Sequence, residues 1–234
     1  CLCRHIIIIG GNHDSASFLN APKALLFALN VHVIGAATQP IDKEVLVLKN
    51  SQGEAAAIVC AVPYLRDRDV RISVDGESSQ DKSLALVNGI KAHYRQTLDL
   101  AQQKQQALGS DVPIIAMGHL FSQGGMTLDA DGVRELYVGS LAHIGADCFE
   151  GYDYVALGHL HVPQSVGGQA HIRYCGSPIP MGVGEAKQQK QVLHVAFTGR
   201  LPEITAINIP CFQVLQRIQG DLPHIQAELM QLMH

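Results

Sequence analysis

The stretch Ile6-Ile7-Ile8-Ile9-Gly10-Gly11-Asn12-His13-Asp14 decides the fold that we expect for this chain. Four β-branched residues in a row predict a strand that is buried on both faces, as in a parallel sheet covered by helices. Two glycines end the strand, and a polar loop follows. The stretch therefore predicts an α/β protein that carries polar side chains at the carboxyl end of a buried strand.

The composition is typical of a compact folded protein and does not indicate what the protein binds. The chain has 234 residues, of which 47% are hydrophobic and 16% are charged, which is enough for one large domain. Its formal net charge of −4 gives no overall positive field for nucleic acid. Phosphate contacts need only a local group of Lys and Arg, and a bound metal adds positive charge. Composition is therefore neutral on DNA binding.

The cysteines and the hydropathy pattern favour a cytoplasmic protein. The six cysteines are scattered and form no Cys-x-x-Cys pair, which is typical of reduced thiols. No apolar run approaches the roughly 20 residues that a membrane-spanning helix needs. We therefore expect no membrane segment.

The order of the remaining predicted elements indicates a layered sandwich with helices outside and loops at the strand ends. These elements are a helix from Ser15 or Ser17 to about residue 30, strands at 31–34, 44–48 and 56–62, a helix at 82–108, a strand at 112–117, a short helix at 139–144, strands at 152–157, 162–166, 170–174, 192–197, 203–209 and 212–218, and a helix from about residue 222. Gly167-Gly168 predicts a tight hairpin turn.

Three predicted strands end in the same way, with a Gly followed by a side chain that can bind a metal ion. These endings are Gly11-Asn12-His13-Asp14, Gly118-His119 and Gly158-His159-Leu160-His161. Gly permits a sharp turn with unusual φ values, so that the next side chain points into the crevice above the sheet. Imidazole and amide oxygen are ligands for Mn, Fe or Zn, and the absence of Cys favours a hydrolytic site over a structural zinc.

Each ending taken alone is more often turn chemistry than a metal site, and only their joint occurrence favours a site. The other histidines lack this context, and we interpret them as surface or packing residues. They are His5, His32, His93, His143, His171, His194, His224 and His234.

The three endings resemble the third, fourth and fifth motifs of the calcineurin-like metallophosphoesterases. Longer stretches resemble the SbcD-type nucleases within that superfamily. They are Asp153-Tyr-Val-Ala-Leu-Gly-His-Leu-His-Val-Pro-Gln164, Arg173-Tyr-Cys-Gly-Ser-Pro-Ile-Pro180, Pro63-Tyr-Leu-Arg-Asp-Arg-Asp69 and Gly118-His-Leu120. The resemblance covers nearly the whole chain and implies a layered αββα sandwich.

The resemblance also implies a centre of two divalent metal ions, Mn²⁺ by family precedent. Asn12, His119 and His159 would bind one ion, and His161 would bind the second. Two ions about 3.5–4 Å apart would hold the phosphate and activate a bridging hydroxide.

Two further residues would act in catalysis. His13 would lie beside the scissile phosphate and stabilise developing charge or protonate the leaving oxygen. Asp14 would either orient His13 through a hydrogen bond or cap the following helix, and the sequence favours neither. Gly176 and Ser177 would shape the loop beside the site in a structural role.

The first two motifs of the superfamily, Asp-x-His and Gly-Asp-x-x-Asp, are absent from this chain. We therefore expect a partial nuclease domain at 1–210 that lacks its first βαβ unit, and the truncated beginning of a capping region at 211–234. The isolated chain should not assemble the two-metal centre, and one face or edge of the Ile6–Ile9 strand should be exposed.

The leading functional hypothesis is a DNA exonuclease and endonuclease subunit that works in DNA repair, recombination and replication. Its partners would be DNA and an SbcC-like ATPase, with a homodimer inside a heterotetramer. The alternatives are another phosphoesterase, acting on nucleotides or phosphoproteins, and a non-catalytic module that binds DNA or a partner. Five basic residues could contact phosphate, although a solvated surface role is the simpler interpretation. They are Arg66, Arg68, Arg71, Lys187 and Lys190.

Overall fold

The computed structural model describes residues 3–72, 75–122, 125–126 and 144–232, and its largest sheet has six strands. In spatial order these are β3 (Val45–Lys49), β4 (Ala55–Ala61), β5 (Ile114–His119), β6 (Tyr154–Gly158), β8 (Gln169–Tyr174) and β7 (Gln164–Val166). The four inner strands run parallel, and both edge strands are antiparallel to their neighbours. The mixed α/β class predicted from the sequence is confirmed.

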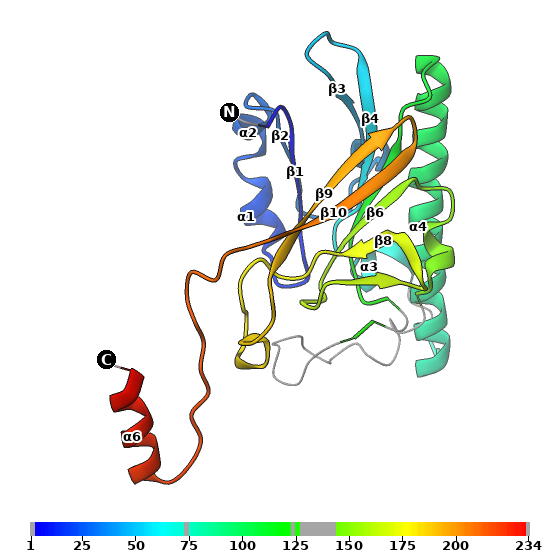
Figure 1. Ribbon diagram of the computed structural model, residues 1–234. Helices are drawn as coiled ribbons and strands as arrows, with labels where there is room; N and C mark the ends of the chain where they lie inside the picture. Colours follow the sequence, from blue (N-terminus) through cyan, green and yellow to red (C-terminus); the bar gives the residue numbers. More distant parts are fainter. Residues whose placement is uncertain (1–2, 73–74, 123–124, 127–143, 233–234) are drawn as a thin grey trace.

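The long helix α4 (Ser79–Leu108) runs along one face of this sheet (Figure 1). Ser78 caps its first turn, because its hydroxyl accepts a hydrogen bond from the Asp81 backbone N–H at 3.1 Å. Gly109 ends the helix with φ 59°, a left-handed conformation that suits glycine. The buried face of α4 packs on β-branched residues of the inner strands, which forms the core. The central members of this core are Ile58, Leu86, Ile90, Tyr94, Leu98, Ile114, Val155 and Ile172.

The strands β1 (Ile6–Ile9) and β2 (Val31–Ile34) form a separate parallel pair. The prediction that the first strand is buried on both faces is wrong, since the exposed fractions of Ile6 and Ile8 are 40% and 38%. The expectation that one face of this strand is exposed is confirmed. A run of β-branched residues predicts a strand reliably, but burial also requires an element on each side, and no described element covers this face.

The predicted helix that follows β1 is two short helices instead. Ser15 caps α1 (Ala16–Asn20) as predicted, with its hydroxyl accepting from the Phe18 backbone N–H at 3.3 Å. Pro22 then stands at the N-cap of α2 (Lys23–Phe27). Proline has no backbone N–H to continue a helix, which explains the interruption.

The second half of the chain is rich in strands, as predicted. Gly167 and Gly168, with φ 57° and 71°, make the tight turn between β7 and β8. Strands β9 (Gln191–Thr198) and β10 (Leu201–Asn208) form an antiparallel hairpin. The short helices are η1 (Ile41–Glu44), α3 (Asp67–Val70), η3 (Ala146–Phe149) and η4 (Val183–Glu185).

The end of the chain differs from the prediction in one element. Residues 212–218 form no strand, and this segment leads to α6 (Leu222–Leu232), which lies away from the sheets (Figure 1). Phe212 and Val214 are exposed there, and no strand among the described residues pairs with this segment. The short helix predicted at 139–144 falls largely on residues outside the described ones.

The described residues include five of the six cysteines, all of them free thiols. In the same part of the chain, no helix is long and apolar enough to cross a bilayer.

We predict that shortening a core residue of α4 destabilises the protein far more than shortening an exposed one. Leu98→Ala should lower the free energy of unfolding by about 2–5 kcal/mol, because Leu98 is 1% exposed and its loss leaves a cavity. Leu108→Ala, on the same helix but 42% exposed, should change it by about 0.5 kcal/mol or less. Urea denaturation would measure both, and equal losses would contradict this packing of α4.

Candidate metal centre

The carboxyl ends of β1, β5 and β6 bring the three histidine-bearing loops together. In the parallel register of β5 and β6, His119 lies opposite Gly158, so the two loops leave the sheet side by side. The end of β1 is joined to the segment after β4, because the Tyr64 backbone N–H donates to the Gly10 carbonyl at 2.8 Å. Strand ends of this kind are where ligands bind in open α/β sheets.

Asn12 and His119 are in direct contact at this junction. The Oδ1 atom of Asn12 lies 2.8 Å from Nε2 of His119. The ring of His159 lies 5.2 Å from that of His119, centroid to centroid, in an edge-on arrangement. An amide oxygen and two imidazoles from three separate loops therefore converge on one region.

Electrostatics connects the remaining predicted site residues to this cluster. Burial, together with the nearby His159, lowers the pKa of His119 to about 4. Asp14 raises the pKa of His119, while His13 and His161 lower it. His119 is therefore a neutral imidazole at neutral pH, which is the form that can bind a metal ion.

The glycines that precede the ligands are needed for close approach. A Cβ atom at Gly11 would lie 2.8 Å from Cε1 of His119, and one at Gly158 would lie 3.1 Å from its Nδ1. At Gly118 it would lie 2.1 Å from the Tyr94 hydroxyl. The predicted reason, unusual φ values, is wrong for these three glycines. The positive φ in this region belongs to His159, at 103°.

Asp14 does not cap the helix. Its carboxylate accepts a hydrogen bond from the Gly11 backbone N–H at 2.7 Å, and Ser15 takes the N-cap position. The helix-cap alternative is therefore wrong, and Asp14 holds the loop in shape across three residues. His13 is exposed beside it, and its catalytic role stays a prediction.

His161 contacts a buried carboxylate that the sequence analysis missed. Its Nδ1 lies 2.8 Å from Oε1 of Glu185, a residue with no exposed surface. Glu185 also contacts Ser177 and Lys190. Burial raises the pKa of the Glu185 carboxyl, but hydrogen bonds from these three partners outweigh it and leave the pKa below its usual value. The only sequence signal was an acidic residue in a glycine-rich loop.

The predicted roles of two basic residues need correction. Lys190 is 5% exposed and paired with Glu185, so it is neither a solvated surface residue nor placed to contact phosphate. The guanidinium of Arg71 is paired with Asp67 at 2.5 Å and Glu77 at 2.9 Å. Both cations are held by carboxylates, which sequence alone cannot show.

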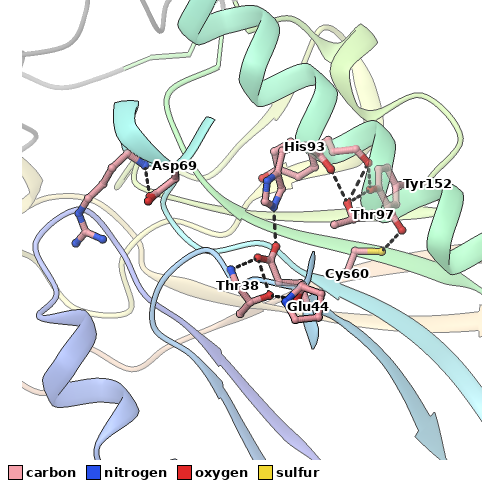
Figure 2. A network of polar contacts seen from close by, with 10 residues as sticks. Thr38, Glu44, Cys60, Asp69, His93, Thr97 and Tyr152 are labelled. Carbon is pink, nitrogen blue, oxygen red and sulfur yellow. Dashed lines mark hydrogen bonds and ion pairs between the residues drawn. The ribbon is translucent and has the colours of Figure 1, made fainter. Parts of the chain in front are cut away.

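His93 is a packing residue, as predicted, and it belongs to a second buried histidine–carboxylate pair. Its Nε2 lies 2.7 Å from Oε2 of Glu44, which has no exposed surface (Figure 2). The other oxygen of Glu44 accepts from the Thr38 backbone N–H at 2.7 Å. This pair joins α4 to the β3 edge of the sheet, whereas β8, which leads to Glu185, lies near the opposite edge.

The donors that converge at the strand ends are chemically suited to a divalent metal ion. Within the described part of the chain, no three His, Cys, Asp or Glu side chains form a group that could hold an ion. The fit therefore depends on the amide oxygen of Asn12 together with His119 and His159, with His161 as a donor to a neighbouring ion. Amide oxygen and imidazole nitrogen are ordinary ligands of Mn, Fe and Zn.

The fold and this site define the class as an α/β protein with a histidine-rich site at the ends of parallel strands. Comparison with curated proteins then finds the D subunit of the SbcCD nuclease. The Escherichia coli K12 protein is 36% identical over 228 residues, which are 97% of this chain and 55% of the relative. The Rhodobacter capsulatus and Bacillus subtilis 168 proteins are 33% and 32% identical over 77% and 81% of the chain.

The resemblance to the SbcD-type nucleases is therefore confirmed for the aligned region. The chain spans about half the length of the curated relatives that it matches, at 55%, 44% and 46%. No family model matches it.

We predict that Gly11→Ala moves the His119 ring away from Asn12. The new Cβ would overlap the ring, which should cost about 1–3 kcal/mol of stability and change the ¹H and ¹⁵N shifts of His119. Gly199→Ala is the matched control, since its φ is 61° but no atom lies within 4 Å of the added Cβ. The control should lose roughly 1–2 kcal/mol from backbone strain and leave the His119 shifts unchanged. Equal His119 spectra in both variants would contradict the close packing.

Proposed function

We propose that this chain carries part of the catalytic site of a metal-dependent DNA exonuclease and endonuclease. The observation that carries the proposal is the contact of Asn12 with His119, beside His159, at the ends of parallel strands. The relatives at 36%, 33% and 32% identity, each named as a nuclease subunit, support the reaction class. We propose Mn²⁺ as the ion.

In this proposal each side chain has one role. Asn12, His119 and His159 hold one ion, and His161 contributes to a second. When bound, the ions supply charge for the phosphate and an activated hydroxide. The low pKa of His119 keeps its ring neutral at neutral pH, so that one ring nitrogen keeps a lone pair.

His13 is the proposed catalytic acid. It is exposed at the tip of a loop that Asp14 holds in shape, so it can reach a phosphodiester that lies over the strand ends. From there it can stabilise charge on the phosphate or give a proton to the leaving oxygen. Asp14 then acts on His13 through the position of the loop.

The finer fold and partner assignments belong to the same proposal. The separate β1–β2 pair and the six-stranded sheet would be parts of the layered αββα sandwich of the calcineurin-like superfamily. Residues 211–234, which include α6, would begin a capping region that faces DNA. An SbcC-like ATPase would drive the enzyme as a heterotetramer built on a homodimer, in the cytoplasm.

We predict that a protein extended to the length of its relatives cleaves duplex DNA from its ends when Mn²⁺ is added. His13→Ala should lower kcat by about 10²–10⁴-fold and leave Mn²⁺ binding unchanged, because His13 acts on the phosphate or the leaving oxygen and is not a ligand. A single-turnover assay on a labelled duplex would measure the loss in cleavage rate. Hydrolysis of a small phosphodiester without DNA cleavage would favour another phosphoesterase. DNA binding without any cleavage would favour a non-catalytic module.

We also predict that the 234-residue chain alone shows no Mn²⁺-dependent cleavage. The proposed ligands are one amide and three imidazoles, without a carboxylate to bridge the ions, and two unscreened cations about 4 Å apart repel strongly. The same duplex assay, with the longer protein as the positive control, would test this. Robust activity of the short chain would show that the proposed ligand set is incomplete.

A further inference from the structure

The contact between His161 and Glu185 determines which ring nitrogen of His161 carries a proton. Oε1 of an ionised carboxylate can only accept, so Nδ1 of His161, 2.8 Å away, is the donor. In the neutral imidazole the proton then sits on Nδ1, and Nε2 carries the lone pair. The side chain of His161 is 22% exposed and that of Glu185 is fully buried, so the carboxylate lies on the protein side of the ring.

The second oxygen of Glu185 is held by two other donors. Oε2 accepts from the Ser177 hydroxyl at 2.8 Å and from the Lys190 ammonium. Lys190 also donates to the Ser177 oxygen at 2.7 Å and to Gln188 at 2.5 Å, so all of its three protons have partners. This arrangement fixes the plane of the carboxylate and directs Oε1 at the imidazole.

The loop after β8 also restrains the backbone of His161. The Ser177 backbone N–H donates to the His161 carbonyl at 3.3 Å. Gly176 has φ 85°, and a Cβ there would lie 2.7 Å from that carbonyl oxygen and 2.9 Å from the Pro163 ring. His161 is therefore restrained at its backbone and at its ring by one short segment.

A purely structural role for the buried Glu185–Lys190 pair is the simpler alternative. In that interpretation Ser177 and Gln188 satisfy Lys190 and Oε2 of Glu185, and His161 only satisfies the buried Oε1. Yet one carboxylate oxygen is aimed at the ring of a residue on another loop. The pair of His93 with Glu44 has the same chemistry, but His93 is 9% exposed and comes from the middle of α4 rather than from a strand-end loop.

We propose that Glu185 is a positioning residue, which sets the tautomer and orientation of His161 so that Nε2 faces a divalent metal ion. The inference deepens the proposed function and rests on it for the identity of the ion. Carboxylates that accept from the second nitrogen of a ligating histidine are known to matter for metal affinity, by about 10–100-fold when removed. Ser177 and Lys190 act through Glu185 and do not face the ion.

The first test needs no metal. In the ¹⁵N-labelled, chelator-treated 234-residue chain, two-bond ¹H–¹⁵N spectra at a pH where the imidazole is neutral report the His161 tautomer. The wild-type chain should show Nδ1–H. Glu185→Gln should shift His161 towards Nε2–H, because the amide is a weaker acceptor and can also donate. Glu44→Gln, which alters the matched pair at His93, should leave His161 unchanged. An unchanged His161 tautomer in Glu185→Gln would overturn the inference.

The second test measures affinity in a protein of the relatives' full length. Glu185→Gln should weaken Mn²⁺ binding by about 10–100-fold, and Glu44→Gln should leave it unchanged. Equal affinities for the two variants would overturn the positioning role. If Glu185→Gln fails to fold because Lys190 is left unpaired, Glu185→Gln combined with Lys190→Gln removes both charges and serves in both tests. A failure of the nuclease proposal can be told apart from a failure of this inference. In that case the wild-type protein would bind Mn²⁺ and cleave no DNA.

Discussion

The contact between the ring of His119 and the amide of Asn12 is the constraint on which the candidate site depends. The two residues come from different sheets, 107 positions apart in the chain, and their polar atoms lie 2.8 Å apart. A ring can enter that junction only if the surrounding backbone carries no side chains. Gly11 and Gly158 meet this requirement on two sides of His119. Gly118 must also lack a side chain, because its strand passes close to the Tyr94 hydroxyl.

The same constraint links the core to the site. The parallel register of β5 and β6 places His119 opposite Gly158, and the core beneath α4 holds that register through residues such as Ile114 and Val155. A change in register of one residue would turn His119 to the opposite face of the sheet. The geometry of the site therefore depends on the packing of α4 on the sheet, even though the ligands of the site lie on loops.

Much of the fold and of the candidate site could be predicted from sequence, because the signals are local. The strands at 6–9 and 31–34, the Gly167-Gly168 turn and the three glycine–ligand endings each depend on a few neighbouring residues. Burial of the Ile6–Ile9 strand could not be predicted, because it depends on a covering element elsewhere in the chain. The strand predicted at 212–218 likewise has no partner strand in the part of the chain that the structure describes.

The buried charged residues show most clearly what could not be predicted from the sequence. Lys190 and Glu185 look like surface residues in the sequence, yet their exposed fractions are 5% and 0%. A buried ion pair leaves no periodic signal, because its partners come together only when the loop after β8 folds. Glu44 was missed for the same reason, since its partner His93 is 49 residues away. The residues at the strand ends were therefore predictable from sequence, whereas the carboxylates behind them were not.

The segment His159-Leu160-His161 shows how one short loop serves two places in the site. Leu160 is 2% exposed and packs in the core, whereas His159 and His161 on either side of it are only partly buried. His159 takes a φ of 103°, which costs roughly 1–3 kcal/mol for a residue other than glycine. Burial of Leu160 is of the same order, at roughly 1.5–3 kcal/mol, and can offset this strain. The anchored leucine thus lets one imidazole face His119 while the other meets Glu185.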